Sequence, residues 1–76
     1  MGTGKLTEVK IGQKVKIVKL LAEGALKKRL LDMGLVPGVQ VKVERVAPFG
    51  DPVELVLRGY ALSLRKEEAA LVAVEI

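Results

Sequence analysis

The chain has 76 residues, half of them apolar, and a formal net charge of +4. This length fits one small domain without a second hydrophobic core, and the high apolar content excludes an intrinsically disordered protein. Cysteine and histidine are both absent, which excludes disulfides, zinc sites of the usual Cys/His kind and acyl transfer of the Ser-His or Cys-His type.

The N-terminal quarter predicts an unstructured start followed by a strand. Residues 1–5 carry no packing pattern, so we expect a disordered or added N-terminus and a single domain over residues 6–76. From Lys14 to Ile17 polar and apolar residues alternate, which is typical of a strand with one solvent-exposed face.

The hydrophobic period changes to that of a helix between Ala25 and Met33. One helical face carries Leu26, Leu30 and Met33, with Leu31 beside them. Gly34 stands where a left-handed residue would end the helix, and Pro37 prevents its continuation. We therefore predict a helix of about two to three turns.

The charges of this helix oppose its dipole. Lys27, Lys28 and Arg29 lie near the positive end and Asp32 lies near the negative end. Each such charge costs about 0.3–1 kcal/mol when exposed. Two interpretations stay open: tertiary packing outweighs this cost, or the basic first turn serves to bind a partner.

The middle of the chain predicts a turn and a bent strand. Residues 36–38, Val-Pro-Gly, fit a type II turn. Residues 39–44 then alternate between valine and polar side chains. The alternation slips by one residue at 44–46, which indicates a β-bulge.

The last third predicts further short strands. Residues 53–57 and 60–64 alternate on either side of a tight reversal at 58–59. A helical turn is expected over residues 66–70, and residues 72–76 form a last strand. About five short strands with one inserted helix favour a small SH3-like barrel, because closure removes most sheet edges.

A turn-rich loop follows the bent strand. It comprises Pro48, Phe49, Gly50, Asp51 and Pro52. Phe49 either packs into the mouth of the barrel or stands exposed as an anchor for a partner. Asp51 is expected to stabilise the turn by a side-chain hydrogen bond. This loop and the basic end of the helix are the two candidate interaction surfaces.

No pattern indicates catalysis or a metal centre. The downstream acidic residues include Asp51, Glu54, Glu67 and Glu68. None is paired at a spacing that would bring two carboxylates into one pocket. Nothing resembles a calcium-binding EF-hand loop, and the glycines of residues 34–38 lack the Lys-Ser/Thr ending of a P-loop. We therefore predict a protein that is not an enzyme and has no cofactor or metal site.

The positive net charge raises the question of whether the protein binds nucleic acid. Lysines in the first quarter are Lys5, Lys10, Lys14, Lys16 and Lys19. Later basic residues alternate with acidic ones, and only Phe49 and Tyr60 are aromatic, whereas nucleic-acid-binding domains usually carry a denser basic stripe with aromatic side chains. A protein partner is thus the first hypothesis, a nucleic-acid-binding barrel the second, and metal sensing through carboxylates the third.

No part of the chain predicts membrane insertion. No apolar run approaches the roughly 18–20 residues that cross a bilayer, and the N-terminus lacks a signal-peptide pattern. The expectation is a soluble, cytoplasmic protein.

Five segments, in their order and spacing, resemble the FeoA family over Leu6 to Ile76. They are Gly12; Arg29–Leu35 with Pro37-Gly38; Ala47–Pro52; Arg58–Tyr60; and Leu64–Ala69. Phe49 stands where the family more often has leucine.

The resemblance implies an SH3-like domain that acts in bacterial ferrous iron uptake. It implies binding, and regulation, of the FeoB membrane transporter through its cytosolic GTPase domain, at the inner face of the membrane, without enzymatic activity. The contact would use Lys27, Lys28 and Arg29 together with residues 48–52. The same fold occurs as a C-terminal domain of metal-dependent repressors. That context needs a DNA-binding helix-turn-helix upstream, and the expectation from residues 1–76 is that this protein is not of that type.

Overall fold

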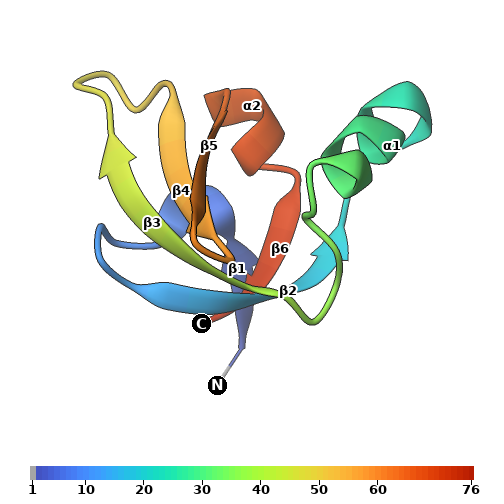
Figure 1. Cartoon of the computed structure of the whole chain (residues 1–76), viewed down its shortest axis with the longest axis horizontal. Coiled ribbons are helices and arrows are strands. Elements are labelled where there is room, and N and C mark those ends of the chain that lie inside the picture. Colours follow the sequence, from blue (N-terminus) through green and yellow to red (C-terminus); the bar gives the residue numbers. More distant parts are fainter. Residues whose placement is uncertain (1) are drawn as a thin grey trace.

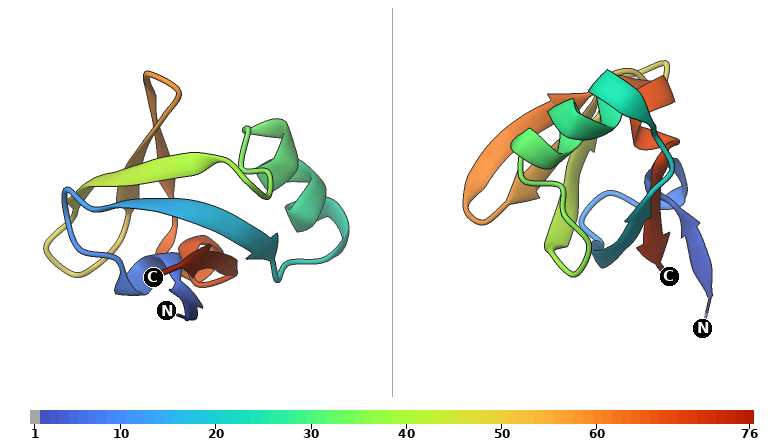
Figure 2. Two further views of the ribbon diagram at one scale, coloured as in Figure 1. Left: turned by 90° about the horizontal axis from the view of Figure 1, so that it is seen from below. Right: turned by 90° about the vertical axis from the view of Figure 1, so that its right-hand side faces the viewer.

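The computed structural model describes residues 2–76, which form a strongly bent antiparallel sheet of six strands with two helices (Figure 1). The elements in chain order are β1 (Thr3–Lys5), the 3₁₀ turn η1 (Leu6–Glu8), β2 (Lys14–Leu20), α1 (Gly24–Asp32), β3 (Gln40–Val46), β4 (Val53–Leu57), β5 (Tyr60–Leu64), α2 (Lys66–Ala69) and β6 (Val72–Glu75). The strand order is β1-β6-β2-β3-β4-β5, so β1 and β5 are the edges of the sheet. Figure 2 shows the sheet curling around its own interior, with α1 outside it at one end.

Two irregularities bend the sheet. The register between β3 and β4 shifts between Val43 and Arg45, which confirms the bulge expected at residues 44–46. A second shift lies between Ile17 and Lys19, where β2 pairs with β6. Because bulges increase the local twist and bend, β2 can pair with β3 in its first half and with β6 in its second.

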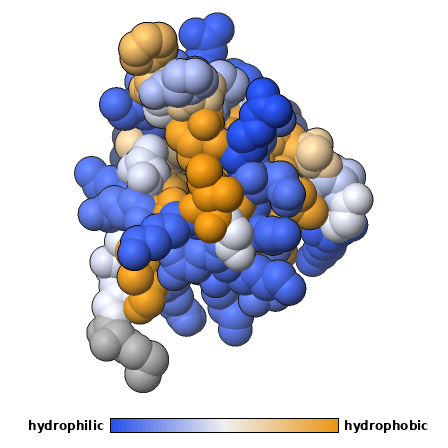
Figure 3. Space-filling model, turned by 90° about the vertical axis from the view of Figure 1, so that its left-hand side faces the viewer, coloured by the Kyte–Doolittle hydropathy of each residue, from blue (hydrophilic) through white to orange (hydrophobic). Residues whose placement is uncertain are grey.

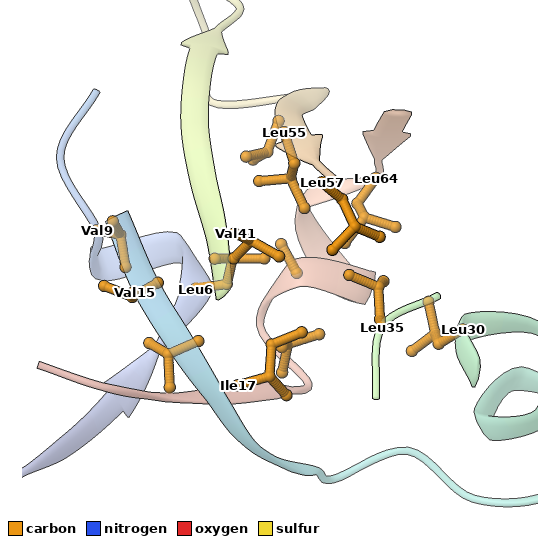
Figure 4. Packing of buried hydrophobic residues seen from close by; sticks show 14 of the residues in the cluster. Leu6, Val9, Val15, Ile17, Leu30, Leu35, Val41, Leu55, Leu57 and Leu64 are labelled. Atoms are coloured by element: carbon orange, nitrogen blue, oxygen red, sulfur yellow. The ribbon is translucent and has the colours of Figure 1, made fainter. Parts of the chain in front are cut away.

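Strands β2 to β6 fill the interior with aliphatic side chains from their inner faces. The largest fully buried side chains are Leu6, Ile17, Leu30, Leu35, Val41, Val43, Leu55, Leu57, Leu64, Val72 and Val74. In Figure 4 the leucines of β4 and β5 point toward the strands opposite, and Leu30 of α1 lies with Leu35 at one end of the cluster. The alternation predicted for residues 39–43 and 53–57 is therefore confirmed.

Helix α1 ends where the sequence predicts. Gly34 has a φ of +99°, and its N–H donates to the carbonyl of Leu31 at 2.9 Å. The Leu35 N–H donates to the carbonyl of Leu30 at 3.1 Å, which completes a Schellman motif. A Cβ at position 34 would lie only 2.9 Å from Cδ2 of Leu57, so the backbone conformation and the approach of β4 both require glycine.

The predicted turns are also present. Gly38 has a φ of +93°, and the Val39 N–H donates to the carbonyl of Val36 at 3.1 Å, as a type II turn over residues 36–38 requires. The reversal at residues 58–59 joins β4 to β5 directly. The helical turn expected over residues 66–70 is α2.

The N-terminus differs from the prediction. Residues 3–5 were expected to lie outside the domain, but they form β1, which pairs with β6 in the register Gly4 to Val74. The Ile76 N–H donates to the carbonyl of Gly2 at 3.0 Å, just beyond the end of β6. Backbone hydrogen bonds hold β1 at the edge of the sheet. The strand therefore does not need an alternating side-chain pattern from which it could have been predicted. The expectation for Met1 lies outside the described residues.

Candidate partner-binding surface

The basic residues predicted to contact a partner lie in the first two turns of α1. Lys27, Lys28 and Arg29 are all exposed. Within residues 2–76 neither lysine forms an ion pair, whereas Nη1 of Arg29 lies 3.0 Å from Oε2 of Glu68. The two lysines are therefore available for an external contact, and the arginine is already held by the fold.

Glu68 is a buried charged side chain, although its place in the sequence predicts a solvent-exposed carboxylate. Its side chain is only 8% exposed, and its Oε1 accepts the N–H of Arg65 at 2.9 Å while Oε2 pairs with Arg29. This carboxylate thus accepts a backbone N–H at the start of α2 and links α2 to α1. The spacing Arg65-x-x-Glu68 is that of a capping box, but arginine in place of the usual serine or threonine conceals it.

The loop between β3 and β4 presents an aromatic side chain to solvent. Phe49 is 93% exposed, so it does not pack into the mouth of the barrel, and its use as an anchor stays a prediction. The loop backbone is fixed by a hydrogen bond of 2.8 Å from the Gly50 N–H to the Ala47 carbonyl and one of 3.1 Å from the Ala47 N–H to the Pro52 carbonyl. Pro48 adds its own restriction of φ. Phe49 therefore stands on a loop with little freedom to lose on binding.

Asp51 stabilises the loop in a way that the sequence did not show. Its Oδ1 accepts the backbone N–H of Lys66, the first residue of α2, at 3.0 Å. The bond was expected within the turn itself, but it joins the loop to a segment 15 residues later. Asp51 thus positions the loop.

An apolar hollow of about 90 Å³ lies beside this loop. Its lining consists of Leu6, Thr7, Val9, Val46, Gly50, Val53 and Lys66. Phe49 is not among these residues, because its side chain points into solvent. Figure 3 faces the side of the molecule on which the loop lies and shows apolar side chains gathered in a band between hydrophilic ones.

The two predicted surfaces do not form one continuous patch. In Figures 1 and 2 the loop and α1 lie at opposite ends of the molecule. The short helix α2 lies between them and is bonded to both, through Lys66 to the loop and through Glu68 to α1. The two surfaces are therefore separate, and α2 connects them.

Acidic side chains do not gather in the part of the chain that the structure describes. Among residues 2–76 no three Asp or Glu side chains lie close enough together to hold a metal ion. Over the same residues no helix is long and apolar enough to cross a membrane.

Comparison with protein families identifies the domain. Residues 4–76 match the model of the FeoA domain. A curated relative from Porphyromonas gingivalis, a fusion of Fe(2+) transport protein A with the Fe(2+) transporter FeoB, is 39% identical over 72 residues, which are 95% of this chain. The chain spans only 8% of the length of that fusion protein.

Solved structures support the same assignment. The FeoA-like protein of Clostridium acetobutylicum is 43% identical, with a TM-score of 0.89 over 100% of this chain and 88% of its own. The zinc complex of Stenotrophomonas maltophilia FeoA, described as an SH3 domain protein, is 25% identical, with a TM-score of 0.81 over 93% of this chain and 88% of that one. The SH3-like fold expected from the sequence is thereby confirmed. A manganese-dependent transcriptional repressor, 12% identical with a TM-score of 0.85 over 95% of this chain and 40% of its own, shares the fold alone.

Proposed function

This chain belongs to the FeoA family, and from that premise we propose that it is a non-enzymatic accessory protein of bacterial ferrous iron uptake that binds and regulates a FeoB-type transporter. The observation that carries the proposal is the relative in which the two proteins form one polypeptide. Fusion raises the effective concentration of two modules that bind each other. We propose that binding occurs at the cytoplasmic side of the membrane, on the GTPase domain of the transporter.

The proposed contact uses Phe49 as an anchor. An exposed aromatic side chain on a fixed loop can bury a large apolar area at a small entropic cost, because the loop is already ordered. Such anchors commonly contribute 2 kcal/mol or more, which corresponds to about thirtyfold in affinity. Pro48, Gly50, Asp51 and Pro52 hold the anchor in place.

Lys27 and Lys28 supply the second contact. Charges at the rim of an interface change the association rate and its salt dependence more than the affinity at high salt. Arg29 contributes by fixing α1 against α2, since its guanidinium is paired with Glu68.

The test is a titration of the full chain against the full-length transporter of the same organism, solubilised in detergent. We expect Phe49→Ala to weaken binding by about thirtyfold. Ile11→Ala removes an apolar side chain that is 62% exposed on another loop, and it is the matched control that should bind normally. Lys27→Glu with Lys28→Glu should slow association at low salt, and Lys5→Glu with Lys10→Glu should not.

The possible outcomes test the proposed function and the proposed binding surface separately. No binding of the unmodified chain to the transporter would refute the proposed function. Binding that is insensitive to the Phe49 and lysine variants would refute only the surface. A transporter without its GTPase domain that still binds would exclude that domain as the docking site, and GTP hydrolysis by the isolated chain would contradict the non-enzymatic role.

A further inference from the structure

A second charged surface lies on the outer face of the sheet, at the β4–β5 turn. It is a shallow groove of about 340 Å³ whose lining includes Lys14 of β2, Lys42 of β3 and Arg58 after β4. Gln40, Val41, Val56 and Gly59 complete its lining. None of these residues belongs to α1 or to the loop over residues 47–52.

The strand register brings these cations together. Lys14 lies directly opposite Lys42, and Lys16 lies opposite Gln40. Lys42 in turn lies opposite Val56, and Arg58, in the turn that follows β4, lines the same groove. Because neighbouring strands are about 4.8 Å apart, the outer face carries a compact basic array. We call Lys14, Lys16, Lys42 and Arg58 the basic face.

The side chains of the basic face repel one another in the folded protein. Like charges directly opposite each other on paired strands are destabilising. Within residues 2–76 the ion-pair partner on this face is Glu44, whose Oε2 lies 3.6 Å from Nζ of Lys42 and whose side chain is half exposed. One long, exposed pair leaves most of the positive charge without a counter-charge.

We propose that the basic face binds an extended acidic segment of a partner protein. Successive residues on the same side of an extended peptide are about 6.6 Å apart, which matches the spacing of cations on alternate positions of one strand, such as Lys14 and Lys16 of β2. The half-buried Val56 lies among the cations and offers an apolar contact.

The same face is poorly suited to nucleic acid or to a free inorganic anion. No aromatic side chain is available on it for base stacking. Phe49 lies in the loop between β3 and β4, and Tyr60 lies opposite Leu57, on the other face of the sheet from Val56. Glu44 and Glu54 follow along β3 and β4 and would repel a continuing phosphate backbone. No buried polar side chain lines the groove, so a small anion would have only mobile, hydrated contacts.

This proposal does not depend on the proposed function, because it specifies the chemistry of the bound segment and not the identity of the protein that carries it. The probe is a fluorescein-labelled peptide with four Glu-Ser repeats, and the matched probe has four Gln-Ser repeats. The variant carries Lys14→Gln, Lys42→Gln and Arg58→Asn. The control carries Lys5→Gln, Lys10→Gln and Arg65→Asn, which removes the same charge from other exposed positions.

We expect the Glu-Ser peptide to bind the unmodified chain, with amide shifts at Lys14, Lys42 and Arg58, and the Gln-Ser peptide not to bind. The groove variant should bind about tenfold more weakly, as the loss of three exposed ion pairs implies, while the control changes by less than about twofold. Lys14→Gln alone should keep or raise the urea midpoint, because it relieves the repulsion with Lys42. Equal weakening by variant and control, absence of peptide binding, or tighter binding of a single-stranded oligonucleotide in this groove would overturn the proposal.

Discussion

Replacement of Gly34 by alanine tests the contact between the end of α1 and β4. The new Cβ would meet Cδ2 of Leu57 at 2.9 Å and the Tyr60 hydroxyl at 3.0 Å, on a backbone with a φ of +99°. Gly38 has a similar φ of +93°, but nothing lies within 4 Å of its added Cβ. Gly38→Ala therefore isolates the cost of the left-handed conformation, and Gly34→Ala adds the steric overlap.

The two costs can be estimated separately. A left-handed alanine costs about 1–2 kcal/mol, and overpacking of a core costs about 1–3 kcal/mol. Leu57 is fully buried and cannot move aside into solvent, so the overlap cost applies to Gly34→Ala. We expect about 1–2 kcal/mol of destabilisation for Gly38→Ala and about 2–5 kcal/mol for Gly34→Ala.

Urea unfolding, followed by circular dichroism, measures both variants. A chain of this length has a total stability of roughly 4–11 kcal/mol, so a loss of about 2–5 kcal/mol is a large part of it. A Gly34→Ala chain that is already unfolded without urea would correspond to the upper end of the expected cost. Destabilisation of the two variants to the same extent, within about 0.5 kcal/mol, would show that the approach of β4 does not require glycine at position 34, and the reasoning would fail.

Three further variants test the core, the link between the helices and the exposed anchor. Leu55→Ala removes a fully buried side chain and should cost about 2–5 kcal/mol in urea unfolding, whereas Ile11→Ala should leave the midpoint unchanged. Glu68→Ala should cost about 0.5–2 kcal/mol, since the first turn of α2 loses its acceptor. Glu67→Ala, on the exposed side of α2, should not shift the midpoint. Phe49→Ala should leave the unfolding midpoint unchanged while weakening binding to the transporter, and a lowered midpoint would show that the ring packs on the domain.

The elements that the sequence predicted are those in which neighbouring residues carry the signal. The alternation of residues 39–43 and 53–57 follows from burial on one face of a strand, and Gly34 follows from the steric needs of a helix end. Thr3–Lys5 could not be found in this way, because an edge strand of three residues is defined by its pairing with β6 and not by its own side chains.

The functional features depend more on contacts that are distant in the sequence. Lys27, Lys28 and Phe49 stand out locally, and the structure leaves them exposed. The bonds from Glu68 to α1 and from Asp51 to α2 span 39 and 15 residues and have no local signature. The basic face is similar: Lys14 and Lys42 become neighbours only through the register of β2 and β3.

The adjacent ends of the chain bear on how such a domain can be tethered. Gly2 and Ile76 exchange backbone hydrogen bonds, and both ends lie at the bottom of Figure 1, away from α1 and the Phe49 loop. A polypeptide joined at either end would leave from the same corner, without unwinding a strand of the core. Tethering on that corner would hold the domain near a larger protein while Lys27, Lys28 and Phe49 point outward, ready to reach it.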